Sequence, residues 1–239
     1  MAAKSDRVDP RLEGTSHTAA AAIEAAGGQA LAVKCDIRDE AQVEAAVEAG
    51  VERFGGIDAV INNASAIYPR PTADVPMKRY DLMHQVNGRG TFLTTQKCLP
   101  HLMKAENPHI IALAPPLDMR GMWFGQHVAY TSAKYQMSLC ILGWGEEFKG
   151  KIGANAIWPR TAVATAAISN VLAGEEAMKS CRKPEILADT AYAVLNKPPP
   201  TFPGNFIIDY SFLWDAGERD LAKYSHDPSY ALLPDFCVL

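Results

Sequence analysis

Short apolar runs alternate along this chain with longer segments in which apolar residues recur every three or four positions. A short apolar run bounded by glycine or polar residues predicts a buried strand, whereas the longer period is typical of an amphipathic helix. The short runs predict strands at residues 30–34, 58–62, 109–113, 152–157 and 204–209. The periodic segments predict helices at residues 15–26, 39–54, 78–105, 128–148 and 182–196.

Strands and helices alternate over most of the chain, which predicts an α/β fold with a parallel sheet covered by helices on both faces. Such sheets bind ligands beyond the carboxyl ends of their strands. The segments that follow predicted strands are therefore candidates for a site, and they lie at residues 36, 62–65, 114–117 and 158–165. No internal repeat, low-complexity tract or linker divides the sequence, so we expect residues 1–239 to form one domain.

Composition and charge narrow the function classes. Of the 239 residues, 48% are hydrophobic and 21% are charged, which is enough for a normal core. The net charge of -4 gives no basic excess of the kind that nucleic-acid modules show. No apolar run reaches the roughly 18 residues of a membrane span, and the start of the chain has no apolar secretory core. The cysteines include no Cys-x-x-Cys pair and the histidines no His-x-x-x-His, so we expect a reducing intracellular compartment, the cytoplasm or an organelle, and no metal site.

Tyr130 and Lys134 form the most informative polar pair, because a spacing of four places both on one face of a helix. A free tyrosine has a pKa near 10, about three units too high for a base at neutral pH. A nearby ammonium favours the phenolate, so such a pair can give and take a proton. The spacing alone is also common by chance, and a solvated helix face is the alternative interpretation.

Four further polar positions follow predicted strands or interrupt a helix. The run 62–65, Asn-Asn-Ala-Ser, can tie strand ends together or form an ordinary Asx turn. Asp36 can accept a hydrogen bond from the exocyclic amine of a purine, or it can be a capping or loop aspartate. Asn87 lies in an otherwise apolar helix, where a polar side chain usually bonds a backbone carbonyl at a bulge. The fourth position is the run 158–161, Trp-Pro-Arg-Thr.

In their order along the chain these positions resemble the short-chain dehydrogenase/reductase family over about residues 1–210. The matching residues are Asp36, Asn62-Asn63-Ala64, Asn87, Tyr130 with Lys134, and Pro159 with Thr161. Shorter stretches, among them Pro115-Pro116-Leu117 and Pro234-Asp235-Phe236, resemble the hydroxysteroid dehydrogenase-like branch. The fold that this resemblance implies is a Rossmann-like doubly wound parallel sheet.

The resemblance also implies an NAD(P)-dependent oxidoreductase that interconverts a carbonyl and a secondary alcohol on a small or lipid-like apolar substrate. By this resemblance, Tyr130 would donate a proton to the substrate carbonyl. Lys134 would lower the pKa of the tyrosine and hold the nicotinamide ribose, and Asn87 would hold a water molecule. The implied cofactor-binding residues are Lys4, Ser5, Asp36, Ile37, Asn63, Ala64, Ser65, Tyr130, Lys134, Thr161 and Thr165. The family's variable substrate loop corresponds to residues 158–182, and its two long helices pair into homodimers or homotetramers.

The family's catalytic serine has no counterpart in this chain. The branch usually reads Ile-Ser-Pro-Pro where this chain reads Leu113-Ala114-Pro115-Pro116, and residues 105–129 contain no Ser or Thr. Loss of one oxyanion donor typically costs about 10²–10³ in rate, which leaves room for a weak enzyme. Gln126 or His127 can supply a substitute donor, or both can be ordinary loop residues.

The front of the chain departs further from the family. Family members open with a strand, Gly-x-x-x-Gly-x-Gly, a helix and a second strand, and the glycines here form no such motif. The expected fold therefore lacks the first strand–helix unit and most of the second strand, and with them the backbone cradle for a pyrophosphate. In the family the missing strand separates the 58–62 strand from the second and third strands. We expect a truncated enzyme chain; the alternative is a catalytically impaired relative that acts as a binding or interaction protein.

Lys4 and Ser5 fall where the family selects its dinucleotide. A basic or hydroxyl residue there suits a 2′-phosphate, whereas an acid binds a ribose 2′-hydroxyl. The resemblance therefore implies NADP as the cofactor, with NAD as the alternative. The other interpretation of Lys4 is a solvated terminal lysine.

Overall fold

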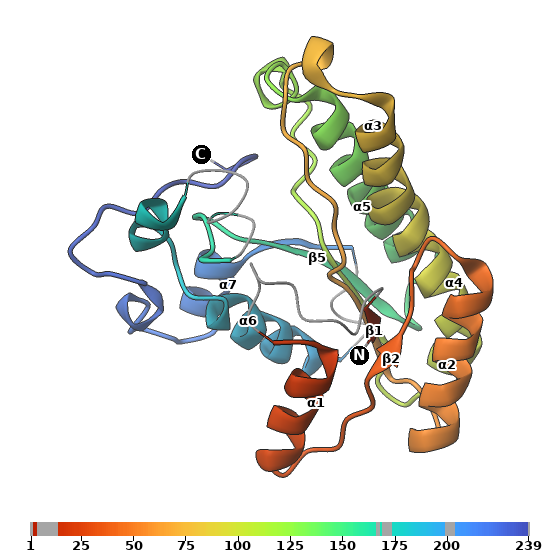
Figure 1. Ribbon diagram of the computed structural model, residues 1–239. Coiled ribbons are helices and arrows are strands. Elements are labelled where there is room, and N and C mark those ends of the chain that lie inside the picture. The colour runs from red at the N-terminus through yellow and green to blue at the C-terminus, as the bar shows by residue number, and fades with distance from the viewer. Residues whose placement is uncertain (1, 4–13, 166–167, 169–173, 199–203, 239) are drawn as a thin grey trace.

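A computed structural model describes residues 2–3, 14–165, 168, 174–198 and 204–238 (Figure 1). Four strands form a parallel sheet in the order β3, β4, β5, β6. They are β3 (Ala59–Asn62), β4 (His109–Leu113), β5 (Gly153–Trp158) and β6 (Phe206–Ile208). The register pairs Ala59 with His109 and His109 with Gly153. The α/β fold with a parallel sheet, which the alternation of elements predicts, is confirmed.

A separate two-stranded sheet joins β1 (Ala2–Ala3) to β2 (Val33–Lys34), again in parallel. Within the described residues no hydrogen-bonded strand links this pair to β3, whose sheet neighbour is β4. Ile61 of β3 is accordingly 47% exposed, although it lies in a strand. The break falls where the resemblance places the absent central strand. Lys4 and Ser5, the expected selectors of the dinucleotide, lie outside the described residues.

The helices follow the predicted order with small shifts at their ends. They are α1 (Ser16–Ala25), α2 (Glu40–Phe54), α3 (Met77–Met83), α4 (Thr91–Leu102), α5 (Val128–Glu147), α6 (Glu185–Leu195) and α7 (Asp209–Asp215). Asp39 caps α2 by accepting a hydrogen bond from the Gln42 backbone N–H at 3.2 Å, and Gly55 ends that helix at φ 86°. The helix α7 was not predicted, because it continues directly from β6.

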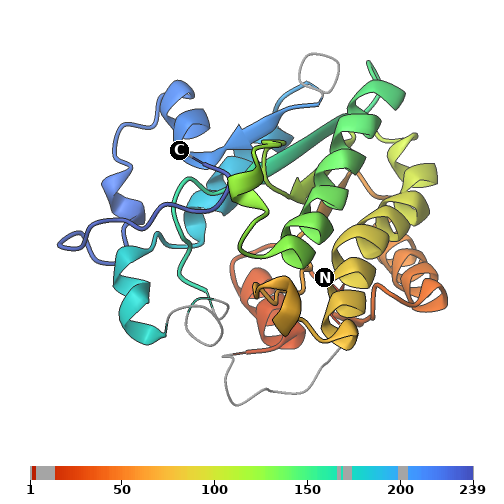
Figure 2. The ribbon, with the colours of Figure 1, turned by 90° about the horizontal axis from the view of Figure 1, so that it is seen from above.

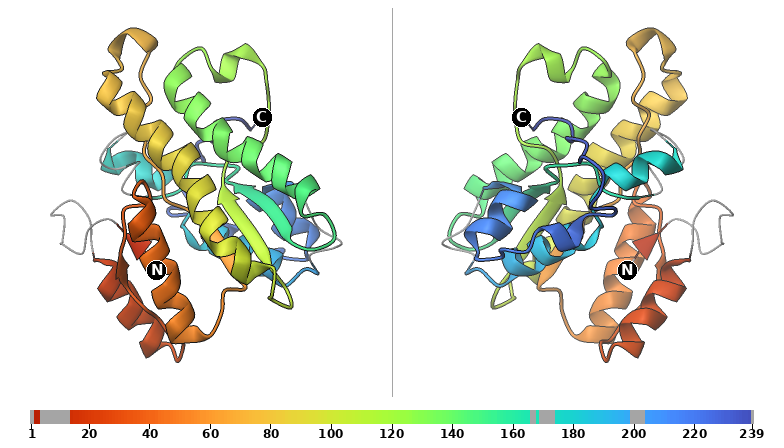
Figure 3. Two further views of the ribbon diagram at one scale, coloured as in Figure 1. Left: turned by 90° about the vertical axis from the view of Figure 1, so that its right-hand side faces the viewer. Right: turned by 90° about the vertical axis from the view of Figure 1, so that its left-hand side faces the viewer.

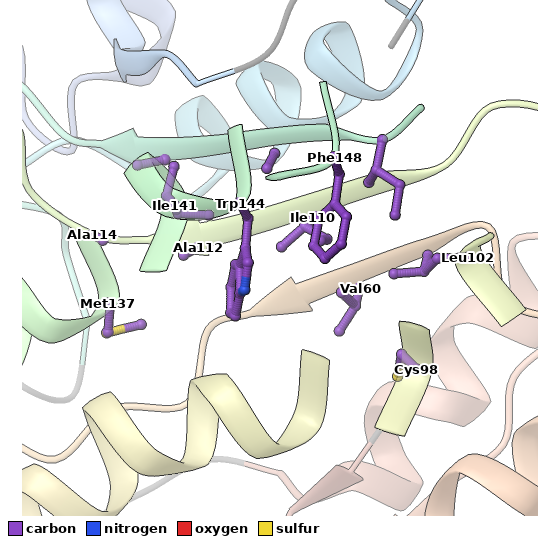
Figure 4. Close-up of a cluster of buried hydrophobic side chains, with 13 residues drawn as sticks. Val60, Cys98, Leu102, Ile110, Ala112, Ala114, Met137, Ile141, Trp144 and Phe148 are labelled. Carbon is purple, nitrogen blue, oxygen red and sulfur yellow. The ribbon is translucent and has the colours of Figure 1, made fainter. Parts of the chain in front are cut away.

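Helices cover both faces of the sheet (Figure 3). On one face Ile110 of β4 packs with Leu102 of α4 and with Ile141 and Trp144 of α5, all of them buried (Figure 4). On the other face Ile111, Ile157 and Ile207 pack against Val194 of α6. Successive strand residues point to opposite faces, so both faces of β4 are apolar and buried. This two-sided core is the doubly wound arrangement that the sequence predicts.

The single helix expected at 78–105 is interrupted in its middle. Residues His84–Gly90 form a π-helical stretch between α3 and α4. Asn87 lies in it, fully buried; its Oδ1 accepts from the Ala66 backbone N–H at 2.7 Å, and its Nδ2 donates to the Ala66 carbonyl at 3.0 Å. A Cβ on Gly90 would lie 2.6 Å from Ile37 Cδ1, so glycine permits this close approach to the loop after β2. The polar residue in an apolar helix thus marks a bulge, as its position predicts.

After α7 the chain returns to the sheet, so that its C-terminal part lies beside the segment that precedes α5 (Figure 2). The carbonyl of Leu233 accepts from the Ala162 N–H at 2.8 Å, and the Asp235 N–H donates to the Arg160 carbonyl at 3.1 Å. Residues 233–237 are called the C-terminal segment below. None of the described helices has the length and apolar character that crossing a bilayer requires.

Candidate active site

Tyr130 and Lys134 lie in the first turns of α5 and line a cavity of about 590 Å³ at the carboxyl ends of the strands. The cavity also contains three other residues that the resemblance assigns to the cofactor: Asn63, Ser65 and Thr165. Its remaining lining is mainly apolar and comes from strand ends and α6, with Ile61, Leu113, Ile157, Val163, Leu187 and Ala191 among it. The structure therefore brings together residues that are far apart in the sequence.

A second cavity of about 230 Å³ adjoins the first, since Ser65 lines both. Asp36, Ile37 and Ala64 also line it. Asn62, the residue before this loop, is buried, and its Nδ2 donates to Thr95 Oγ1 of α4 at 3.0 Å. Of the two interpretations of the Asn-Asn-Ala-Ser run, Asn62 thus ties the strand end to α4, while the next three residues face the two cavities.

Asp36 is held by Arg38 as well as facing the smaller cavity. The Arg38 guanidinium donates from Nε to Asp36 Oδ1 at 2.9 Å and to Oδ2 at 3.1 Å, and the Arg38 backbone N–H donates to Oδ1 at 3.1 Å. A carboxylate with these donors is fixed in orientation. A purine amine at Asp36 would have to share the carboxylate with Arg38.

The hydroxyl of Tyr130 makes no hydrogen bond to any residue the structure describes, and the side chain is 9% exposed. Burial is the largest cause that raises its pKa above the usual value, and the charges of Asp235 and Cys237 raise it further. This direction is opposite to the lowering that the Tyr–Lys pair predicts. The phenol is therefore neutral at pH 7, which is the form that donates a proton.

Lys134 is 3% exposed, and its ammonium is directed to the end of β4. Its Nζ donates to the Leu113 carbonyl at 2.6 Å and lies 5.1 Å from the centre of the Trp158 ring. Burial lowers the pKa of Lys134 to about 8, and the carboxylate of Asp235 opposes that shift. The ammonium thus sits in the cavity wall close to its titration point.

Two of the expected site residues, Asn87 and Thr161, line neither cavity. Asn87 bonds Ala66, directly after the residues that face the cavities, and so holds that loop against the helix. Thr161 is buried beside Pro234 of the C-terminal segment, and its Oγ1 has no partner among the described groups. Within the loop 158–182, residues 166–167 and 169–173 lie outside the described residues.

The position of the missing serine is buried rather than open to the cavity. Ala114 is 1% exposed and packs in the core cluster with Met137 and Ile141 of α5. A serine placed there would have its hydroxyl in the core. Ala114→Ser could raise turnover only if the new side chain pointed at the substrate carbonyl. From this geometry we therefore expect no gain in turnover.

His127 is one of the two candidates to replace the serine as a hydrogen-bond donor. In its neutral form it has no N–H left to offer a substrate. Its Nδ1 lies 2.9 Å from Thr131 Oγ1, and that hydroxyl donates to the Trp123 carbonyl at 2.9 Å. The hydroxyl can therefore only accept from Nδ1–H, which leaves Nε2 unprotonated. Burial lowers the pKa of His127, which favours this neutral form. Gln126 is exposed in the turn that precedes α5. Neither residue takes the place of the serine hydroxyl here.

The C-terminal segment contributes to the site, although no pattern in the sequence predicts this. The ring of Phe236 lies 5.9 Å from that of Tyr130, 5.4 Å from that of His127 and 5.7 Å from that of Trp158, centre to centre. Its carbonyl accepts from Trp158 Nε1 at 2.8 Å. In the sequence, the motif Pro234-Asp235-Phe236 shows a likeness to one branch, and nothing in its local pattern predicts a contact with α5.

The loop after β5 is fixed from its other side by Asp209, the first residue of α7. Asp209 is fully buried, and its Oδ1 accepts from the backbone N–H of Arg160 at 2.9 Å and of Tyr210 at 2.6 Å. Arg160 is thus held between Asp209 and the C-terminal segment. No cluster of metal-binding side chains occurs in the part of the chain that the structure describes.

This arrangement supplies a neutral phenol, an adjacent ammonium and an apolar cavity, which suits proton donation to an oxygen of a bound substrate. Comparison with known proteins gives the family. A family model described as enoyl-(acyl carrier protein) reductase matches residues 10–192. Hydroxysteroid dehydrogenase-like protein 2 of Danio rerio is 53% identical over 99% of this chain, and the human protein of that name is 49% identical over the same share.

The chain spans 56% of the length of each of these two relatives. A short chain dehydrogenase from Mycobacterium thermoresistibile superposes with a TM-score of 0.93 at 47% identity, covering 100% of this chain and 85% of that one. The fold, the cavity at the strand ends and these likenesses agree. The chain belongs to the short-chain dehydrogenase/reductase family and is similar to its hydroxysteroid dehydrogenase-like protein 2 branch.

Proposed function

We propose that this chain is the catalytic part of an NADP-dependent oxidoreductase that interconverts a carbonyl and a secondary alcohol on an apolar substrate. The observation that carries the proposal is that Tyr130 and Lys134 line one cavity with Asn63, Ser65 and Thr165. The resemblance to the family assigns these five residues, from three separate stretches of the chain, to one dinucleotide site. An accidental Tyr-x-x-x-Lys on a solvated helix face would leave both side chains in water, whereas here both are buried.

The residues present fit the two ends of a dinucleotide. The smaller cavity, lined by Asp36, Ile37 and Ala64, suits an adenine, and the larger one with Lys134 and Thr165 suits a nicotinamide with its ribose. The reduced cofactor, when bound, supplies the hydride. The sequence contributes no Gly-x-x-x-Gly-x-Gly for the pyrophosphate between these ends.

Tyr130 and Lys134 have separable roles in this mechanism. In the reducing direction the neutral Tyr130 hydroxyl donates its proton to the carbonyl oxygen, and in the oxidising direction the phenolate takes it back. The Lys134 ammonium stabilises the negative charge that appears on Tyr130 after the transfer. Its hydrogen bond to Leu113 anchors the ammonium at the strand end.

The apolar lining favours an apolar substrate. Ile61, Leu113, Ile157 and Val163 border the cavity from the strands and the loop after β5. The aromatic ring of Phe236 lies against Tyr130 from the C-terminal segment. A carbonyl on a small or lipid-like carbon skeleton matches these surroundings, because apolar contact supplies binding energy and the polar groups lie at Tyr130 and Lys134.

The choice of NADP is tested by calorimetry. Two solved short-chain dehydrogenases of this fold, each 23% identical to this chain, contain NADP in one case and NADH in the other, so the fold does not select between them. We expect this protein to bind NADPH at least about tenfold more tightly than NADH, because Lys4 and Ser5 suit a 2′-phosphate. We expect the 239-residue chain to bind both weakly. Tighter binding of NADH would overturn the NADP assignment, and tight binding by the 239-residue chain would overturn the argument from the missing glycine motif.

We also propose that the chain forms a homodimer or homotetramer through α4 and α5. Three large apolar side chains on these helices are exposed: Phe92 by 50%, Leu139 by 56% and Leu142 by 51%. Exposed apolar side chains that lie close together often mark a protein–protein interface. Sedimentation equilibrium is expected to give a mass of two or four chains, and Leu139→Glu combined with Leu142→Glu is expected to give one chain. A monomer at micromolar concentration before substitution contradicts this proposal.

The alternative function is a binding or interaction protein on the same fold. The missing glycine motif and the alanine at position 114 favour it. A spectrophotometric assay of NADPH oxidation with a panel of aliphatic and aromatic ketones and aldehydes separates the two. Turnover that depends on Tyr130 supports the enzyme, and cofactor binding without any turnover supports the alternative.

A further inference from the structure

The two tyrosines of α5 are held in different ways. The hydroxyl of Tyr135 donates to the Asp118 carbonyl at 2.6 Å and accepts from the Asp118 N–H at 3.2 Å. The hydroxyl of Tyr130 has no such partner among the described residues, and the side chain lines the larger cavity. The position of the Tyr130 phenol is therefore set by what packs against its ring.

Two aromatic rings pack on that of Tyr130. His127 and Phe236 both lie 5.9 Å away, centre to centre, at interplanar angles of 83° and 44°. Aromatic pairs attract at centre distances of about 4.5–7 Å. His127 immediately precedes α5 and moves with the tyrosine, since its Nδ1 lies 2.9 Å from Thr131 Oγ1 on the same helix. Phe236 is thus the ring that joins the phenol to another part of the chain.

The buried apolar residues in the same cluster do not replace Phe236. They are Met83, Ala129 and Ala133. The two alanines belong to α5 itself and are short. Met83 comes from α3, and an unbranched thioether adapts to its surroundings rather than fixing them. A flat ring held from outside the helix constrains a phenol more firmly.

Phe236 is itself fixed on several sides. Besides Tyr130, its ring contacts His127 at 5.4 Å, Trp158 at 5.7 Å and Trp123 at 6.4 Å, centre to centre. Its carbonyl accepts from Trp158 Nε1 at 2.8 Å. Phe236 therefore links the start of α5 to Trp158 at the end of β5.

The C-terminal segment holds Phe236 in place from the loop after β5. Pro234 and Thr161 form an antiparallel bridge, and the Leu233 carbonyl accepts from the Ala162 N–H at 2.8 Å. Phe236 follows this pairing by two residues. Its ring is therefore held by a paired backbone rather than by a loose end.

We propose that Phe236 is a positioning residue, whose ring, held by the C-terminal segment, keeps the Tyr130 phenol aligned for proton transfer. Its effect on turnover rests on the proposed function, but its hold on the Tyr130 ring does not. Proton transfer needs the two heavy atoms within about 2.6–3.2 Å, and a misplacement of about 1 Å can cost about 10² in rate. Phe236 is not among the residues that line the cavity, so it acts through Tyr130 rather than on the substrate.

The first test compares the same substitution beside each tyrosine of α5. Phe236→Leu is expected to lower kcat about 10- to 10²-fold and to leave the affinity for NADPH nearly unchanged. The matched control is Phe124→Leu, because Phe124 is also half-buried and its ring lies 5.0 Å from that of Tyr135. We expect both variants to lose melting temperature, and kcat to stay nearly unchanged in Phe124→Leu. Steady-state kinetics, calorimetry with NADPH and thermal unfolding check these outcomes.

The second test measures the Tyr130 ring directly and needs no turnover. In protein labelled with ¹³C in the tyrosine rings, the Tyr130 signal is assigned by its loss in Tyr130→Phe. We expect the order parameter of this ring to fall by about 0.2 or more in Phe236→Leu and to stay the same in Phe124→Leu. If Phe236→Leu does not fold, Phe236→Met, which keeps an unbranched apolar side chain, takes its place in both tests.

The two tests separate positioning from packing. A lower kcat together with a more mobile Tyr130 ring supports the proposal. An unchanged order parameter in the folded variant overturns it, and so does a loss of melting temperature without a loss of kcat, which is what a merely structural role predicts. If the protein shows no turnover at all, the ring measurement still decides whether Phe236 holds Tyr130, so this proposal and the proposed function fail separately.

Discussion

Tyr130→Phe is expected to lower turnover by about 10²–10⁴-fold, the usual contribution of general acid catalysis. The substitution removes one hydroxyl, which makes no hydrogen bond to the residues described and lines the cavity. The ring keeps its contacts with His127 and Phe236. We therefore expect the melting temperature and the affinity for NADPH to stay nearly the same.

Tyr135→Phe is the matched control, because Tyr135 lies five residues further along the same helix and carries the same group. Its hydroxyl donates to the Asp118 carbonyl at 2.6 Å and accepts from the Asp118 N–H at 3.2 Å, away from the cavity. Its loss is expected to cost about 1 kcal/mol of stability and less than tenfold in rate. Steady-state kinetics and thermal unfolding of both variants check the pair. Equal turnover in Tyr130→Phe and the unmodified protein excludes Tyr130 as the proton donor.

The elements of the sheet are predictable from the sequence because each signal is local. The predicted bounds of β4, residues 109–113, agree with the structure. The sequence shows its end clearly, because the mainly apolar run stops where Ala-Pro-Pro begins. The start and end of α2 follow from Asp39 and from Gly55, whose backbone conformation favours glycine. The residues that gather at the strand ends follow from the rule that parallel strands present their carboxyl ends at one edge.

The features that were missed depend on contacts between distant parts of the chain. A bulge at Asn87 is predictable from the sequence, but its length over residues 84–90 and its partner Ala66, 21 positions away, are not. The pairing of Leu233 with Ala162 joins residues 71 positions apart, with no periodic pattern around the former. The pKa of Tyr130 moves upward chiefly because the side chain is buried, and burial is a property of the folded chain.

Lys134→Met is expected to abolish turnover and to weaken NADPH binding, and yet to raise the melting temperature at pH 7. Burial lowers the pKa of Lys134 from 10.5 to about 8, which corresponds to a cost of about 3 kcal/mol for the charged form in the folded state. Methionine has a similar length and no charge, so it removes this cost. It also leaves the Leu113 carbonyl without its hydrogen-bond donor, and this loss destabilises the folded state by about 1–3 kcal/mol. The net gain is about 1 kcal/mol, or a few degrees for a domain of this size.

The pH dependence of that gain identifies its cause. Because the folded pKa of Lys134 lies below the unfolded one, the unfolded state binds more protons between pH 8 and pH 10.5. The free energy of unfolding attributable to this lysine therefore rises with pH in that window, while the cost is fully present below pH 8. The advantage of Lys134→Met in thermal unfolding should accordingly shrink between pH 7 and pH 10. Lys104→Met, at an exposed position, is the control and should show no such trend. The melting temperature of Lys134→Met could instead fall by the same amount at both pH values. That result would mean that the lysine stabilises the fold through its contacts and that its buried charge does not destabilise the fold.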